Sequence, residues 1–205
     1  MIVSVSTKEV YGYTEMKLGQ LNRNASTGAG KAVLAEIRRG VGKAPGELPK
    51  TWGILFQGMP EKMYSANGEP TRAEWAVYTA LTLYALHQQG SDPAQNSMNQ
   101  KDMRLGVAVS RLCRNAEGRY TDEDRERIAR RFMPLATAGS MPELTHHLRA
   151  IVQLLKTEGI PLDYPALAAD LYRYQFEESE NQVRLQWGQD FYRYNNESEE
   201  NSDEN

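Results

Sequence analysis

Cysteine, histidine and long apolar segments are scarce in this chain of 205 residues, which has one cysteine and three histidines. The single thiol, Cys113, cannot form an internal disulfide, so we expect a packed thiol in a protein of the reducing cytoplasm. A zinc site of cysteine and histidine ligands is excluded, because His146 and His147 point about 100° apart on a helix. The third histidine, His87, is expected to cap a helix or lie at the surface. No apolar run approaches the roughly 20 residues that span a bilayer.

Motifs of nucleotide-binding and hydrolytic enzymes are also missing from the sequence. Neither GxxxxGKS/T nor GxGxxG after a strand occurs, and STGAGK resembles a phosphate loop only superficially because no strand precedes it. The carboxylates of TDEDRE fall in the first turn of a predicted helix, where they interact favourably with the helix dipole. The N-terminus has no basic segment followed by an apolar one, so no secretory signal is expected. We therefore predict a cytoplasmic protein that is not an enzyme and needs no metal or cofactor.

Acidic residues are concentrated at one end of the chain. Residues 177–205 contain nine of the 27 acidic residues but two of the 24 lysines and arginines, and the whole chain has a net charge of −3. The first 176 residues therefore have a net positive charge, which is compatible with binding to nucleic acid. The segment 195–205 has no apolar residue and is predicted to be a disordered acidic tail.

Apolar residues recur with helical periodicity through most of the chain. The predicted helices cover residues 26–42, 71–90, 99–119, 120–139, 141–160, 162–176 and 181–194. Thr71 and Glu74 have the spacing of a capping box, and Thr121 is a predicted N-cap. The loop 43–61 is expected to contain one short helical turn anchored to the core by Trp52, Ile54, Leu55 and Phe56. Only the first dozen residues resemble a strand, so the sequence predicts an all-α fold with one core or two small lobes.

The predicted helix 99–119 carries three arginines on its polar side, with no acidic residue among them. On a helical wheel Arg104, Arg111 and Arg114 lie within about 80° of one another, beside the apolar face. A solvated helix face normally includes glutamates that form ion pairs with neighbouring cations. Two interpretations remain open at this point: surface arginines whose stems cover apolar side chains, or a face that binds phosphates.

Several segments of the second half follow one another in a distinctive order. They are LHQQG…QKDMRLGVAVSRL, GRYTDEDRERIARRFMPLATA, LTHHLRAIVQLLK, IPLDYPALAADLYRY and VRLQWGQDFY. Together with AEIRRGVGKAPGELPKTWGILF in the first half, their order and spacing resemble the CasB family, the small subunit of the type I-E CRISPR complex Cascade. The likeness covers about residues 20–194. We therefore divide the chain into an N-terminal extension (1–19), a CasB-like helical region (20–194) and the acidic tail (195–205).

The resemblance implies a non-catalytic, all-helical protein of two small packed lobes, present as two copies lying head to tail in the complex. It further implies contacts with the crRNA-bound backbone subunits, the large subunit and both strands of target DNA after the R-loop opens, and with crRNA only indirectly. The basic side of the family corresponds here to Arg38, Arg39, Arg119, Arg130, Arg131 and Arg149. Helical periodicity, rather than the resemblance, adds Lys31, Arg104, Arg111 and Arg114. Val107 stands where the family often has a basic residue, which shifts the basic stripe of that helix.

These residues suggest a mechanism for the predicted nucleic-acid binding. R-loop formation exchanges one duplex for another at a small net free energy, so modest protein contacts to the backbone decide whether it persists. Arginines along a groove neutralise phosphates without reading sequence.

Two further classes of function are compatible with the sequence. The chain could be a helical scaffold that binds only protein, with Tyr172, Tyr174, Trp187 and Tyr192 marking an interface. A helix-turn-helix regulator is a weaker alternative, because no short turn joins two helices near a basic recognition helix.

Overall fold

The computed structural model describes residues 4–114 and 121–200, with side chains up to Arg193. Its helices are α1 (Thr7–Arg23), α2 (Gly28–Arg38), α3 (Pro49–Phe56), α4 (Arg72–His87), α5 (Leu105–Ser110), α6 (Asp122–Thr137), α7 (Met141–Thr157), α8 (Tyr164–Tyr174) and α9 (Glu177–Glu200). Two short 3-10 helices, η1 (Glu61–Met63) and η2 (Arg111–Cys113), complete the elements. Between described residues, one isolated β-bridge joins Asn99 and Leu162. The all-α prediction is confirmed.

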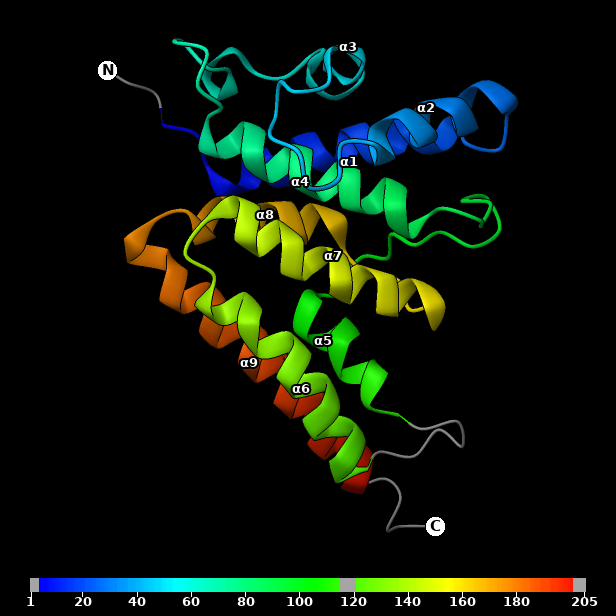
Figure 1. Cartoon of the computed structure of the whole chain (residues 1–205), viewed down its shortest axis with the longest axis vertical. Helices are drawn as coiled ribbons and strands as arrows, with labels where there is room; N and C mark the ends of the chain where they lie inside the picture. The colour runs from blue at the N-terminus through cyan, green and yellow to red at the C-terminus, as the bar shows by residue number, and fades with distance from the viewer. Residues whose placement is uncertain (1–3, 115–120, 201–205) are drawn as a thin grey trace.

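The helices form two packed lobes, as Figure 1 shows. In the larger lobe, α4 is central and is covered by α1, α2, α7 and α8. In the smaller lobe, α5 packs along α9, and α6 lies beside both. The pairs α6–α7 and α8–α9 connect the lobes, and one hydrophobic cluster extends from Tyr84 in α4 to Trp187 and Phe191 in α9. The lobes therefore share a single core.

Side-chain caps explain where several helices begin. Thr71 caps α4 and Glu74 returns the contact to the Thr71 backbone, which confirms the predicted capping box. Thr121 accepts a hydrogen bond from the Asp124 amide at the start of α6, as predicted. Asp163 caps α8 in the same way, and its second carboxylate oxygen also accepts from the Asp102 amide. The last contact fixes the chain before α5 to the start of α8.

The strand predicted for the first dozen residues is wrong, because α1 begins at Thr7. Ser6 and Glu9 form a complete capping box, a signal that the alternating apolar pattern concealed. Val10 and Leu18 of α1 are buried, and the helix packs against α8 and α4. The boundary drawn at residue 20 falls inside α1.

The helix predicted over residues 99–119 is also wrong in extent. Residues before Leu105 form a loop, Arg104 is the N-cap of α5, and the α-helix ends at Ser110. Asp102 has a positive φ of 66° and Arg104 is extended, so the helix begins only at Leu105. Within α5, a Cβ on Gly106 would lie 2.4 Å from the Trp187 carbonyl oxygen and 2.9 Å from the Phe191 amide nitrogen. The two helix backbones therefore touch at Gly106. Residues 115–120 lie outside the described residues.

Three further expectations differ in detail from the structure. Trp52 of α3 is 48% exposed, whereas Leu55 is fully buried, so Trp52 does not anchor the loop to the core. The α9 backbone is helical to Glu200, six residues into the predicted tail, and residues 201–205 lie outside the described residues. No helix in the described part of the chain combines the length and apolar character needed to cross a membrane.

Candidate nucleic-acid interface

A groove of about 510 Å³ separates one face of α2 from the segment that follows α4. Lys31 and Arg38 lie on the same face of α2, two turns apart, and both line the groove. Leu34, Ala35 and Ala85 form an apolar floor between them. The opposite rim is the segment from Gln88 to Pro93. The structure thus brings two of the ten predicted site residues together in one concave site.

Hydrogen bonds within the loop and to two other parts of the chain hold the rim of this groove in place. The Ser26 hydroxyl donates to Asp92 (2.6 Å), which ties the rim to the turn between α1 and α2. The buried Gln88 amide group donates to the Ser91 and Asn96 carbonyls and accepts from the Met98 amide. Met98 in turn accepts from the Leu162 amide before α8. The long polar loop 89–104 is therefore a defined wall.

A third cation lies at the Arg38 end of the groove and was missed in the predicted set. Lys156 near the end of α7 donates a hydrogen bond to the Gln89 side-chain oxygen (3.0 Å), and Gln89 lines the groove. Partial burial lowers the pKa of Lys156, and the nearby positive charge of Arg38 lowers it further. Arg149 and Lys156 share the outer face of α7, so the sequence contained this signal. Its proximity to Arg38 depends on how α2 and α7 pack.

One carboxylate reaches the opposite end of the groove. Hydrogen bonds from the Ser26 hydroxyl and the Ala94 amide lower the pKa of Asp92, and the charge of Lys31 acts in the same direction. Asp92 therefore stays ionised and offsets part of the Lys31 charge. Neither Arg38 nor Lys156 forms an ion pair with a carboxylate of the described residues. The groove is most positive at that end.

Arg104 has a different environment from the one that its own helix suggested. Its Nε lies 3.4 Å from Asp190 of α9, and an Nη lies 3.9 Å from Asp170 of α8. Asp170 also accepts a hydrogen bond from the Trp187 indole (2.9 Å), and burial raises the pKa of this carboxyl. Both acids come from distant segments, so the acid-free polar side inferred from residues 99–119 is neutralised. Arg104 is part of the contact between the lobes.

The remaining predicted residues are distributed over several surfaces. Arg39 is exposed and pairs with Glu36 on its own helix (2.7 Å). Arg119 lies outside the described residues. Arg114 is exposed, and it interacts with another residue of the chain. Four others are exposed and take part in no ion pair between described residues: Arg111, Arg130, Arg131 and Arg149. Leaving Arg114 aside, these four and the two groove residues are the positions of the predicted set that form no ion pair within the described part of the chain.

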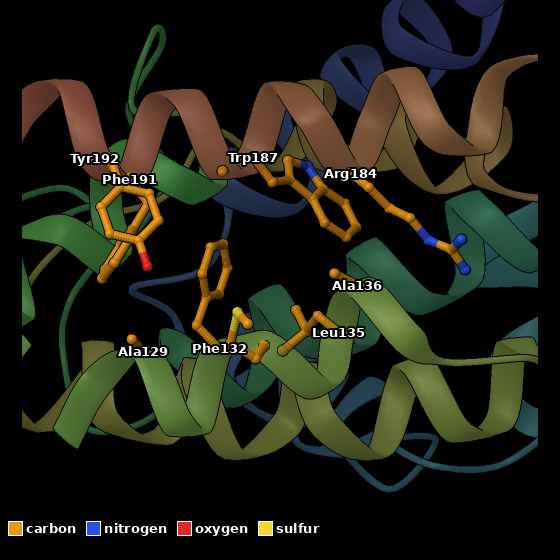
Figure 2. Close-up of a pocket in the computed structure, with 10 residues that line it drawn as sticks. Ala129, Phe132, Leu135, Ala136, Arg184, Trp187, Phe191 and Tyr192 are labelled. Atoms are coloured by element: carbon orange, nitrogen blue, oxygen red, sulfur yellow. The ribbon is translucent and has the colours of Figure 1, made fainter. Parts of the chain in front are cut away.

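A small apolar pocket lies between α6 and α9 and is shown in Figure 2. Phe132 and Trp187 point into the space between the helices, and Phe132 packs against Phe191 with ring centroids 5.3 Å apart. At its rim, Met133 is 61% exposed and Tyr192 is 50% exposed. Three of the four aromatics proposed as an interface are instead buried in the core, with these exposed fractions: Tyr172 9%, Tyr174 6% and Trp187 2%.

The described residues contain no group of three or more histidine, cysteine or carboxylate side chains that could hold a metal. Cys113 is buried, as predicted. His87 is 1% exposed, so its prediction as a capping or surface residue is wrong; its Nδ1 lies 2.9 Å from the Tyr164 hydroxyl. Burial lowers the pKa of His87 to about 4, which keeps the ring neutral at pH 7.

Comparisons with known proteins place this geometry in a family. The family model described as CRISPR-associated protein Cse2 matches residues 33–192. The crystal structure of CasB from Thermobifida fusca is 31% identical, with a TM-score of 0.71 over 90% of this chain and 98% of that chain. A comparison with curated protein sequences gave no match.

Two more distant structures agree in fold. M. ruber CasB is 23% identical, with a TM-score of 0.66 over 93% of this chain and 98% of that one. A chain of a structure described as a CRISPR RNA-guided surveillance complex is 19% identical, with a TM-score of 0.70 over 94% and 99% of the two chains. The resemblance found in the sequence motifs is thereby confirmed: the chain belongs to the CRISPR-associated Cse2 family, which includes the CasB proteins.

Proposed function

We propose that this protein is a non-catalytic subunit of a CRISPR RNA-guided surveillance complex of the Cascade type, acting in the cytoplasm in antiviral defence. In this proposal it contacts the crRNA-bound backbone subunits, the large subunit and a second copy of itself. Its basic surfaces hold both strands of the target DNA by their phosphates and so stabilise the R-loop, while crRNA is contacted only indirectly. Membership of the family and the shared fold with a chain of such a complex support the assembly part.

One observation carries the nucleic-acid part: several arginines are exposed and form no ion pair with an acid among the described residues, although acids are abundant in the chain. Arg130, Arg131 and Arg149 are examples, on the paired helices α6 and α7. On the same α6, Arg125 and Arg127 are paired with Asp122 and Asp124. Because the acids of α6 are confined to its N-terminal half, its later arginines are available to phosphates.

The test uses the assembled complex and compares two double variants of α6. Arg130→Ala/Arg131→Ala should weaken target binding and lower the slope of log K against log salt by up to about 0.9 for each lost phosphate contact. The matched control, Arg125→Ala/Arg127→Ala, removes the same charge from paired positions and should change both quantities less. Equal effects of the two variants would contradict a specific phosphate surface. The purified protein with Mg²⁺ should also leave DNA and RNA uncleaved.

A protein-only scaffold is the second candidate function. The exposed apolar side chains beside the α6–α9 pocket, Met133 and Tyr192, favour it. If all the arginine variants assemble and bind target with unchanged affinity and salt dependence, this candidate replaces the first. The division into an extension (1–19), a family region (20–194) and a tail (195–205) remains a proposal; deleting residues 195–205 should leave the melting temperature unchanged.

A further inference from the structure

The groove between α2 and the segment after α4 has two cationic ends and an apolar middle. Lys31 and Arg38 are seven residues apart on one helix face, which corresponds to a rise of about 10.5 Å. Lys156 adds a second cation at the Arg38 end, and Asp92 is the one carboxylate among the lining residues. The apolar floor of Leu34, Ala35 and Ala85 lies between these ends.

We infer that this groove holds one nucleotide unit of a single-stranded nucleic acid, with a phosphate at each cationic end and the sugar and base over the apolar floor. The inference rests on the proposed function and names the ligand and the residues of one site within it. A volume of about 510 Å³ falls within the range of about 300–1,000 Å³ that is typical of sites for small molecules. A concave site of this size receives a single unpaired nucleotide rather than a double helix.

The Arg38 end is the stronger of the two phosphate positions. Arg38 and Lys156 come from different helices and repel each other, as the lowered pKa of Lys156 indicates after its burial is taken into account. A phosphate between them would relieve this repulsion and accept charge-assisted hydrogen bonds from both. The packing of α2 and α7 against α4 already holds these two cations close together in the free protein. Binding a phosphate therefore requires no further free energy to bring them together.

The wall of the groove is arranged before any ligand binds. Ser26 holds Asp92, and Lys156 holds Gln89, so the rim is tied at both ends. Gln89 uses its side-chain oxygen in that contact, and its amide nitrogen makes no hydrogen bond within the described part of the chain. This nitrogen can donate to a phosphate or to an acceptor on the base. A preformed wall reduces the entropy lost on binding.

The experiment measures fluorescence anisotropy of a labelled 12-nucleotide oligothymidylate with the full chain, at several salt concentrations. Arg38→Ala/Lys156→Gln should lower the salt slope by about 1.4 and the affinity on the order of 25-fold at about 0.1 M salt, for two lost single-strand contacts. Lys43→Ala/Lys50→Ala is the matched control, because both residues are exposed, lie outside the groove and are not among the predicted site residues. Its affinity should stay close to that of the wild type, and both variants should melt at the wild-type temperature.

Two further probes test the nucleotide rather than charge alone. A 12-base-pair duplex should lose little affinity in the groove variant, and an abasic single strand should bind the wild type more weakly than oligothymidylate does. Equal losses for the groove and control variants, or equal losses for single strand and duplex, would overturn the inference. So would a wild-type protein with no salt-sensitive affinity for the single strand. If Arg130→Ala/Arg131→Ala weakens target binding by the complex while the groove variant does not, the inference fails and the proposed function stands.

Discussion

Arg104 and Arg38 look alike in the sequence but have opposite environments in the folded protein. Each lies next to apolar residues and within a stretch rich in basic side chains. Arg104 meets two acids, Asp170 and Asp190, at the contact between the lobes. Arg38 instead lies in an open groove near Lys156, another cation. The difference shows that a basic stripe on one helix predicts a phosphate surface only when the packed neighbours bring no acids.

The groove and the lobe contact also differ in the buried titratable group that lies beside each of them. Beside the groove, His87 is buried and neutral, held against Tyr164 of α8. At the lobe contact, Asp170 is buried next to Arg104 and the Trp187 indole. The lobe contact therefore depends on charges for its stability, whereas the groove displays its charges to solvent. The following predictions separate the two regions, from the largest expected effect to the smallest.

Gly106→Val should have the largest effect, because it breaks the contact between α5 and α9. A side chain at this position meets backbone atoms of Trp187 and Phe191 at less than 3 Å, and backbone cannot move aside as a flexible side chain can. We expect a loss of about 3 kcal/mol or more in the free energy of unfolding, measured by urea denaturation. The matched control is Gly188→Ala in α9, where a Cβ has no neighbour within 4 Å. It should be neutral or stabilising by up to about 1 kcal/mol.

His87 should make the groove side sensitive to acid. The imidazole titrates near pH 6.5 in the unfolded chain, whereas burial lowers the pKa of His87 to about 4 in the folded protein. Between these values the unfolded state binds more protons, so stability falls as the pH decreases, by up to about 3 kcal/mol. Urea denaturation of wild type and His87→Leu at pH 7 and pH 5 measures this. Identical pH dependence in the two proteins would show that His87 does not contribute.

Arg104→Met should cost about 2 kcal/mol at pH 7, because Asp170 and Asp190 would lose their cation; partial exposure of Arg104 keeps the loss below that of a fully buried pair. Burial already raises the pKa of Asp170. Without Arg104 that pKa rises further, so the folded state takes up a proton more readily than the unfolded state, and the stability deficit shrinks as the pH falls toward about 4. Melting curves across this range provide the measurement. A deficit that grows in acid would contradict the assigned ion pairs.

Arg38→Ala should have the smallest effect on stability, within about 0.5 kcal/mol, because Arg38 forms no ion pair with an acid of the described residues. Arg39→Ala should be equally mild, since its pair with Glu36 is exposed to solvent. Melting curves of both variants are compared with those of Arg104→Met, which should lose more stability because Arg104 lies at the lobe contact. A large loss for Arg38→Ala would place this residue among the structural cations instead.

Local sequence determined most of the helices, because capping and helical periodicity act over a few residues. Thr71 with Glu74 and Thr121 marked two helix starts that the structure confirms. The order of the motifs along the chain was also sufficient to indicate the family, which the family model confirms. The secondary structure predicted for residues 2–13 and 99–119 was wrong. In the first, the capping box of Ser6 and Glu9 outweighed an alternating apolar pattern. In the second, the non-helical backbone of Asp102 and its hydrogen bond to Asp163 placed the start of the helix at Leu105.

Only the tertiary structure decided which cations are available to a ligand. The sequence named Lys31 and Arg38 correctly as neighbours on one face, because helical spacing is local. It could not pair Arg104 with Asp170 and Asp190, since those acids are brought to it by the packing of α9 against α5 and of α8 against α9. Nor could it place Lys156 next to Arg38, because that proximity arises from how α2 and α7 pack around α4. Charge compensation acts through space, and the positions of distant charges exist only in the folded chain.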